Sequence, residues 1–198
     1  SGVFRERLPG GRTSTTSYGG PTDEAVVGDW KGDGASDVGV WRPTTHTFSL
    51  ATATGGSHVF SFGRAGDLPV AGDWNGDGRD DVGVFHPATA MFSLRDAHGN
   101  VTTRKFGSVS SWPVAGDWNG DGRFEVGVYD AATAVFSLAL PGGSTRHVTY
   151  GVPGCLPAVG SWNSDAVTDL GVWNPSTATF SERLRHHRSR TIKYGHVR

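Results

Sequence analysis

A period of 44 residues runs through the whole chain and constrains its fold more than any other feature. It is carried by tryptophan, phenylalanine and glycine in three separate phases: Trp30, Trp74, Trp118 and Trp162; Phe4, Phe48, Phe92, Phe136 and Phe180; Gly19, Gly63, Gly107, Gly151 and Gly195. No insertion or deletion interrupts the period over 198 residues. A fixed period of this length indicates one supersecondary unit that is stacked repeatedly, each copy burying an apolar face against its neighbour. We therefore expect a repeat array.

Each repeat reads as four short strands. In the copy that starts at residue 67, strand-like segments at 68–74 and 81–85 flank an Asn-Gly-Asp-Gly cluster, and further segments follow at 91–95 and 101–106. Proline and glycine supply the turns, and no helical pattern of useful length occurs. Strands rich in valine and glycine suit the crowded centre of a ring, and aromatic strands suit its rim. The pattern predicts an all-β protein, a β-propeller of four-stranded antiparallel blades.

The repeats do not divide the chain evenly. We expect a single repeat domain over 1–198, with an N-terminal outer hairpin at 1–22 and full repeats at 23–66, 67–110, 111–154 and 155–198. This gives five outer hairpins but four inner ones. We expect five blade positions with one incomplete blade; an inner hairpin supplied from elsewhere and an open ring are the alternatives.

The loop between the first two strands of each repeat carries the clearest chemical pattern. In the second copy, oxygen-bearing residues stand at loop positions 1, 3, 5 and 9, and position 7 offers its carbonyl: Asp73, Asn75, Asp77, Asp81 and Arg79. Ca²⁺ takes six to eight such oxygens, so the loop is predicted to bind it. An EF-hand would need a glutamate at position 12 and flanking helices, but position 12 is Val84 and the flanks read as strands.

The four loops are not equivalent. The third repeats the full set: Asp117, Asn119, Asp121, Arg123 and Glu125. In the first loop Lys31 replaces the asparagine, and its ammonium is expected to take the place of the metal. The fourth has Ser161 at position 1 and Ala166 at the turn position. We expect Ca²⁺ in loops two and three and weaker or vacant sites at Asp29, Asp33 and Asp37 and at Asp165 and Asp169.

The segment Phe106-Gly107, residues 113–122 and the run Val126-Gly127-Val128 resemble the FG-GAP (VCBS-like) repeat, and the sister copies do so as well. The resemblance implies blades of a calcium-binding β-propeller, as in integrin α-subunit heads, in fungal lectins that bind amino sugars between blades, and in accessory modules of secreted bacterial proteins. Lys31, Ser161, Ala166 and the extra half repeat depart from the pattern.

Candidate ligand-binding residues follow the second strand of each repeat, where an aromatic residue precedes a variable polar one: Trp41 and Arg42, Phe85 and His86, Tyr129 and Asp130, Trp173 and Asn174. Such aromatics are suited to stack on a sugar ring, or they fill the gap to the next blade. Trp112 breaks the repeat phase, and an unrepeated tryptophan is a candidate for a specific contact.

Composition narrows the class of function. A formal charge of −1 and an isoelectric point near 6.7 give no field that favours nucleic acid, and no segment is long and apolar enough for membrane insertion. A single cysteine excludes an internal disulfide framework. No familiar catalytic motif occurs, so we expect no enzyme.

We expect a secreted, calcium-stabilised and lectin-like module that tethers a protein or complex to glycans through clefts between blades. Secretion is argued from calcium loops of this kind, which fill outside cells. The alternative is a scaffold for another protein in a secreted assembly, bound through the rim or the basic last hairpin: Arg183, Arg185, Arg188, Arg190, Lys193 and Arg198. The oligomeric state is left open.

Overall fold

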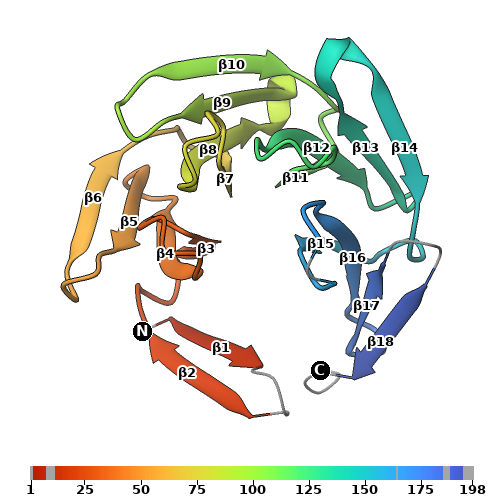
Figure 1. Cartoon of the computed structure of the whole chain (residues 1–198), viewed down its shortest axis with the longest axis horizontal. Coiled ribbons are helices and arrows are strands. Elements are labelled where there is room, and N and C mark those ends of the chain that lie inside the picture. Colours follow the sequence, from red (N-terminus) through yellow and green to blue (C-terminus); the bar gives the residue numbers. More distant parts are fainter. Residues whose placement is uncertain (1, 8–11, 164, 185–187, 194–198) are drawn as a thin grey trace.

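The computed structural model describes residues 2–7, 12–163, 165–184 and 188–193 and arranges them as antiparallel sheets around a ring (Figure 1). Four sheets have four strands each. Blade one comprises β3 (Glu24–Gly28), β4 (Asp37–Arg42), β5 (Thr47–Ala51) and β6 (Ser57–Ser61), and blade two comprises β7 (Leu68–Gly72), β8 (Asp81–His86), β9 (Met91–Arg95) and β10 (Val101–Lys105). Blade three comprises β11 (Trp112–Gly116), β12 (Glu125–Asp130), β13 (Val135–Ala139) and β14 (Thr145–Thr149), and blade four comprises β15 (Leu156–Gly160), β16 (Asp169–Asn174), β17 (Thr179–Arg183) and β18 (Ser189–Lys193).

The expected all-β propeller with four-stranded antiparallel blades is confirmed, but the expected number of blades is not. The described chain forms four blades, not five. The N-terminal outer hairpin is a separate two-stranded sheet of β1 (Val3–Arg7) and β2 (Thr13–Ser17), which lies between blades one and four in the ring (Figure 1). Two strands alone do not make a blade, because the Val/Gly strands that build the inner half of the others are absent from this sheet.

Local sequence explains the inner half of each blade. In blade two, Val70 of β7 lies opposite Gly83 of β8, and a Cβ placed on Gly83 would come within 2.8 Å of the Leu94 side chain. Glycine therefore lets three strands pack closely. A 3₁₀ turn, η2 (Pro87–Thr89), joins β8 to β9, and a second, η3 (Pro141–Gly143), follows β13. None of the helices in the described part of the chain is long and apolar enough to cross a membrane.

The core lies between the blades. Trp41 and Phe48 of blade one form a cluster with Val82 and Val84 of blade two. The next two boundaries repeat this packing, with the aromatic residues of one blade against the aliphatic residues of the following blade. Because each blade covers the aromatic face of the one before it, the stack is stabilised by hydrophobic burial between neighbours.

Hydrogen bonds between backbone groups link the same neighbours. Asp80 N–H donates to Asp29 O at 2.9 Å, Phe124 N–H donates to Asp73 O at 2.8 Å, and Thr168 N–H donates to Asp117 O at 2.8 Å. In each case the acceptor is the first residue of an acidic loop and the donor belongs to the loop of the following blade. The acidic loops are therefore part of the contact between blades.

Candidate functional site

Loop two, residues 73–81, is wrapped around the carboxylate of Asp73. Its Oδ1 accepts hydrogen bonds from Gly76 N–H at 2.6 Å and Asp77 N–H at 3.2 Å, and its Oδ2 accepts one from Gly78 N–H at 2.8 Å. Gly76 and Gly78 adopt positive φ values of 79° and 83°, which lets the amides turn inward. The loop is thus shaped by a buried aspartate at its first position.

Asp81 closes loop two at the start of β8. It is buried, with 4% of its surface exposed, and neither of its carboxylate oxygens makes a hydrogen bond of normal geometry. Burial raises the pKa of this carboxyl to about 7; the amide of Ala97 lowers it, and the nearby carboxylates of Asp77, Asp73 and Asp96 raise it further. A buried acceptor with both oxygens unsatisfied is costly unless a cation or proton meets it.

The structure does not assemble a complete metal centre. Among the described residues, no group of three or more His, Cys, Asp and Glu side chains is arranged to hold a metal ion. In loop two, Asp77 Oδ1 accepts from Arg79 N–H at 2.9 Å, and Asn75 Nδ2 donates to Asp77 Oδ2 at 3.0 Å. Both carboxylate oxygens of Asp77, one of the expected calcium ligands, therefore already accept hydrogen bonds from the loop. The unsatisfied carboxylate of Asp81 is the feature of loop two that fits a cation.

Loop three, residues 117–125, has the same backbone design around Asp117, which accepts from Gly120 N–H at 2.6 Å and Gly122 N–H at 2.8 Å. The carboxylate of Glu125, the last residue of this loop, accepts hydrogen bonds that the carboxylate of Asp81 in loop two lacks. Asn119 Nδ2 donates to Glu125 Oε1 at 2.9 Å, and Trp118 N–H donates to Glu125 Oε2 at 3.2 Å. The longer glutamate therefore reaches partners that Asp81 does not.

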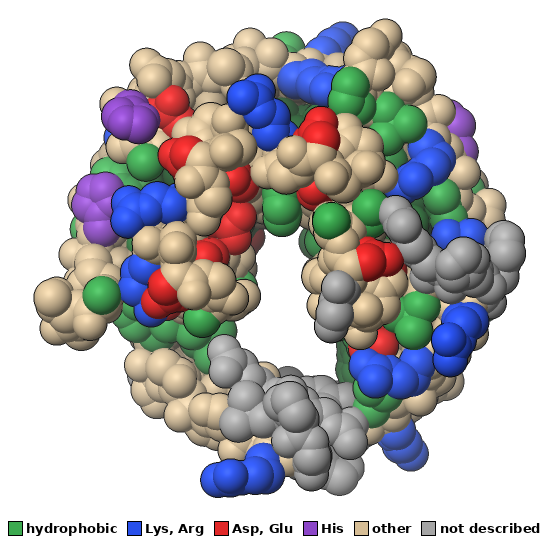
Figure 2. All heavy atoms as spheres, in the orientation of Figure 1, with side chains coloured by type: hydrophobic (Ala, Val, Ile, Leu, Met, Phe, Trp, Pro, Cys, Tyr) green, Lys and Arg blue, Asp and Glu red, His purple; other side chains and the backbone are tan. Residues whose placement is uncertain are grey.

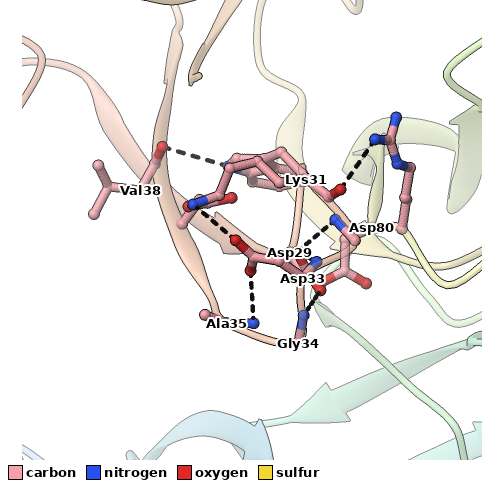
Figure 3. Close-up of polar contacts among 11 residues, drawn as sticks. Asp29, Lys31, Asp33, Gly34, Ala35, Val38 and Asp80 are labelled. Atoms are coloured by element: carbon pink, nitrogen blue, oxygen red, sulfur yellow. Dashed lines mark hydrogen bonds and ion pairs between the residues drawn. The ribbon is translucent and has the colours of Figure 1, made fainter. Parts of the chain in front are cut away.

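Loop one contains a built-in cation, as Figure 3 shows. Lys31 Nζ lies 2.7 Å from Asp37 Oδ1 and 3.3 Å from Asp33 Oδ2. Hydrogen bonds to Asp37 and then to Asp33 raise the pKa of Lys31. Asp29 accepts from Gly32, Asp33 and Gly34 amides, which lower its pKa against the opposing effect of burial. The ammonium of Lys31 lies where its sequence position predicts, between the acidic groups.

Loop four is held by polar side chains instead. Asn163 Nδ2 donates to Asp169 Oδ1 at 3.1 Å, and Trp162 N–H donates to Asp169 Oδ2 at 3.1 Å. Val167 N–H donates to Asp165 Oδ1 at 2.9 Å. Both aspartates expected to form a weak cation site thus have protein partners in this loop.

For three of the four aromatic residues named as candidates to stack on a ligand, the structure favours the alternative, packing against the next blade. Trp41, Phe85 and Tyr129 are completely buried, and Trp173 is half-buried. The rings of Phe85 and Phe92 lie 4.7 Å apart, and those of Tyr129 and Phe136 lie 4.5 Å apart. Direct ligand stacking by the three buried rings is therefore corrected to a packing role, because the next blade covers them.

The polar partners of these aromatics are accounted for within the protein. Arg42 Nε donates to Asp23 Oδ2 at 3.1 Å, and His86 Nδ1 lies 2.6 Å from Asp67 Oδ1. Asp130 Oδ1 accepts from the Ala132 amide. Asn174 Oδ1 accepts from the Ser176 amide and hydroxyl. Of the predicted ligand residues, Trp112 is the one with a large exposed ring, at 42%.

The structure reveals a cleft between blades one and two, and none of the residues predicted to bind a ligand lines it. Its volume is about 480 Å³, within the range of ligand pockets. Blade one contributes the end of β5 with its turn, the side chains of His58 and Phe60 on β6, and loop one with Lys31. Blade two contributes Arg79, Asp80, Asp81, Arg95, Asp96 and Ala97. On the face seen in Figure 2, acidic side chains gather around the central opening, with basic and histidine side chains outside them.

The cleft brings hydrogen-bond donors and acceptors together, and blade two contributes both arginines and all three aspartates of its lining. The guanidinium carbon of Arg95 lies over the Phe60 ring, 4.4 Å from its centre, and the ring attracts the cation. Burial raises the pKa of Asp80, whose Oδ2 accepts from Asp29 N–H. Hydrogen bonds, first from the Asn100 side chain, lower the pKa of Asp96. Asp81 lines both the cleft and loop two, so the two sites share a wall.

The two residues that meet in this cleft stand at repeat phases that vary from copy to copy. Arg95 stands where Ala51 and Ala139 stand in blades one and three, but blade four has Arg183 there; Phe60 stands where blade two has Arg104 and blade three has Val148. At the boundary of blades two and three the corresponding Ala139 is fully buried. Because alanine and arginine alternate at this phase along the chain, Arg95 does not stand out in the sequence, and nothing there marks the cleft.

Comparison by sequence finds no matching family model and no matching curated protein. By structure the chain is similar to virginiamycin B lyase from Staphylococcus aureus, with a TM-score of 0.54, 12% identity, and coverage of 97% of this chain and 63% of that one. A streptogramin B lyase gives a TM-score of 0.56, 9% identity, and coverage of 98% and 62%. A protein of unknown function from Bacteroides caccae gives 0.56, 14% identity, and coverage of 88% and 62%. The chain thus spans less than two thirds of the length of these proteins.

These likenesses establish the propeller fold and correct one expectation. The prediction that the chain is not an enzyme was drawn from missing motifs, and it is contradicted by the structural neighbours, because virginiamycin B lyase is an enzyme with the same fold. The absence of familiar motifs does not exclude catalysis on such a scaffold.

Proposed function

We propose that this chain is a calcium-stabilised binding module that takes a carbohydrate in the cleft between blades one and two. The observation that carries the proposal is the cleft itself, which is lined by Arg95, held over Phe60, and by three aspartates. Sugar rings present adjacent hydroxyl groups that both donate and accept hydrogen bonds. A rigid guanidinium and carboxylates in one cleft match that pattern better than a purely apolar ligand.

Calcium enters the proposal through Asp81. Its buried and unsatisfied carboxylate would complete an oxygen set with Asp73, Asn75, Asp77 and the Arg79 carbonyl. Because Asp81 also lines the cleft, an ion bound in loop two would fix one wall of the carbohydrate site. We expect the equivalent ion in loop three to strengthen the contact between blades three and four.

A secreted setting follows from the affinity expected for such loops. Extracellular calcium modules bind with dissociation constants on the order of 10⁻⁴–10⁻³ M, so they fill outside cells and stay largely empty in cytosol. The module would then tether a protein or complex to surface glycans.

Docking of another protein is a second candidate, and one surface favours it. Val109, Trp112, Val152 and Leu156 are exposed by 66%, 42%, 53% and 38%, and they stand at or just before the first strands of the adjacent blades three and four. Among the described residues, the basic hairpin is a weaker candidate for binding a partner, because Arg190 already forms a two-point ion pair with Glu182. Arg185 and Arg198 lie outside the described residues.

A glycan array in millimolar calcium tests the proposal, with matched arginine variants. Arg95→Ala should lower the signal of any bound glycan by roughly tenfold or more, because it removes a charge-assisted donor. Arg104→Ala is the control, since Arg104 also lies over a ring, that of Phe106, but outside the cleft. Binding of no glycan by the folded, calcium-loaded chain would contradict the proposal. Retained binding of a secreted protein in that case, lost in Trp112→Ala, would favour docking.

A further inference from the structure

Blade four turns an aromatic face toward the two-stranded sheet, and this face is less covered than its equivalents. Phe48, Phe92 and Phe136 are completely buried, as are the aromatic residues beside them on the second strands. At the same positions in blade four, Trp173 and Phe180 are only half-buried. Trp162, also half-buried, meets Phe180 edge-on at 5.4 Å. Three large rings therefore form an apolar face at the end of the array.

The other three boundaries show what covers such a face. Phe85 and Phe92 of blade two pack in one cluster with Val126 and Val128 of β12. Tyr129 and Phe136 of blade three pack with Leu170 and Val172 of β16 in the same way, as do Trp41 and Phe48 with Val82 and Val84 of β8. In each case the covering element is the second strand of the next blade. That strand has a glycine with one branched aliphatic residue on each side of it.

The two-stranded sheet offers the edge on which such a strand would pair. β1 occupies the phase of the third strand of a blade, and β5, β9, β13 and β17 each pair with a second strand as well as a fourth. Within the described chain β1 pairs only with β2. In Figure 1 no strand is drawn between β1 and the centre of the ring, where the complete blades place two.

Backbone contacts beside this edge keep the register of a complete blade. Tyr18 N–H donates to Gly2 O at 3.0 Å, which matches the bond of 2.9 Å from Tyr150 N–H to Ala134 O at the turn between β12 and β13. At the facing blade, Ser161 stands at the loop position whose carbonyl accepts the bond between neighbouring blades elsewhere. No described backbone amide reaches Ser161 O.

We propose that the space framed by the edge of β1 and the face of Trp162, Trp173 and Phe180 binds a β-hairpin of a partner polypeptide. Its second strand carries two branched aliphatic residues about a glycine, pairs with β1 and covers the aromatic face. Its loop donates a backbone amide to Ser161 O. The hairpins of this kind in a second copy of the chain are already paired within their own blades, so the partner is a different segment. This inference does not rest on the cleft or on calcium.

A synthetic peptide with the sequence of residues 68–86 is the first probe, titrated by calorimetry into the whole chain. We expect binding at equal stoichiometry and a higher melting temperature. A peptide with Val82→Asp and Val84→Asp should bind at least roughly tenfold more weakly, because it would bury two carboxylates against aromatic rings. Trp173→Ala in the protein should weaken binding similarly, and Val59→Ala, on the exposed outer strand of blade one, should leave it unchanged.

An isolated hairpin is only marginally stable in water, so a second measurement keeps the test decisive. A copy of residues 112–133 is fused directly ahead of Gly2, which puts the new strand in register with β1. The fusion should raise the melting temperature and shield Trp173 from a soluble quencher. The same fusion with Val126→Asp and Val128→Asp in the added copy should do neither.

Three results would overturn the proposal. The first is an unchanged melting temperature in the fusion together with no peptide binding. The second is equal binding by the native and the aspartate-bearing hairpins. The third is self-association of the unmodified chain that Trp173→Ala abolishes, which would make a second copy the occupant of this face.

Discussion

Asp80 and Asp29 are joined by a reciprocal pair of hydrogen bonds across the boundary between blades one and two. The Asp80 amide donates to the Asp29 carbonyl at 2.9 Å, and the Asp29 amide donates to Asp80 Oδ2 at 2.8 Å. Thr168 and Asp117 make the same pair with a hydroxyl in place of the carboxylate, at 2.9 Å. The side chain at this position therefore links neighbouring blades in two boundaries.

Replacing Asp80 tests that link. Asp80→Ala should lower the free energy of unfolding by about 1–2 kcal/mol, because the Asp29 amide loses its acceptor. Asp80→Thr should cost less, because threonine already fills this role in blade four. Urea unfolding of the three proteins measures the difference. An Asp80→Ala variant as stable as the unmodified chain would show that the side-chain bond contributes nothing.

Lys31 is expected to make loop one independent of metal. Lys31→Asn gives the loop the pattern of loops two and three, and it removes the ammonium from Asp33 and Asp37. The variant should melt at a lower temperature in EDTA and recover most of the loss in millimolar calcium. Thermal melts in both buffers check this, with Lys31→Met as the control that should not recover. Equal melting of all three proteins in EDTA would contradict the role given to Lys31.

The pKa of Asp81 predicts a pH dependence with a definite sign. Burial raises the pKa of the folded carboxyl from 3.8 to about 7, so without calcium the folded state binds the proton more tightly than the unfolded state. The resulting stabilisation is present below the unfolded value and is lost as the pH rises through the folded value. In EDTA, the unmodified chain should lose stability relative to Asp81→Asn between about pH 4 and pH 7. Calcium should reverse this trend, since it favours the carboxylate. Parallel pH profiles of the two proteins in EDTA would rule out this account.

The unequal burial of equivalent aromatic residues predicts unequal costs of truncation. Phe85 is completely buried, whereas Trp173 at the same phase in blade four is half-buried. Phe85→Ala should cost about 3–5 kcal/mol of unfolding free energy. Trp173→Ala should cost about half as much, although tryptophan is the larger residue. Denaturant unfolding compares the two, and a larger loss for Trp173→Ala would mean that its face is covered in solution.

The period of the sequence was enough to predict the strands and the propeller. The pattern of Val82, Gly83 and Val84 recurs in every blade, with Leu170 in place of the first valine in blade four, so one interpretation of the repeat applies to all four. The ammonium of Lys31 in loop one was also predictable, because a single substitution in an acidic loop has one evident partner. These features depend on residues close together in the chain or on exact repetition.

Features between blades were harder to predict. The burial of Trp41 and Phe85 depends on the valines of the following blade, and sequence alone left packing and ligand contact as alternatives. The cleft depends on Arg95 and Phe60, which come from different blades and stand at repeat phases that vary from copy to copy. The number of blades depends on what pairs with β1, which the chain's own pattern does not determine.

Calcium titration by calorimetry is the most direct test of the central claim that loops two and three bind calcium and stabilise the propeller. The account predicts two sites with dissociation constants on the order of 10⁻⁴–10⁻³ M. It also predicts a rise in melting temperature over the same range, with both effects lost in the variant carrying Asp77→Ala and Asp121→Ala. No heat of binding and an unchanged melting temperature in millimolar calcium would contradict the claim.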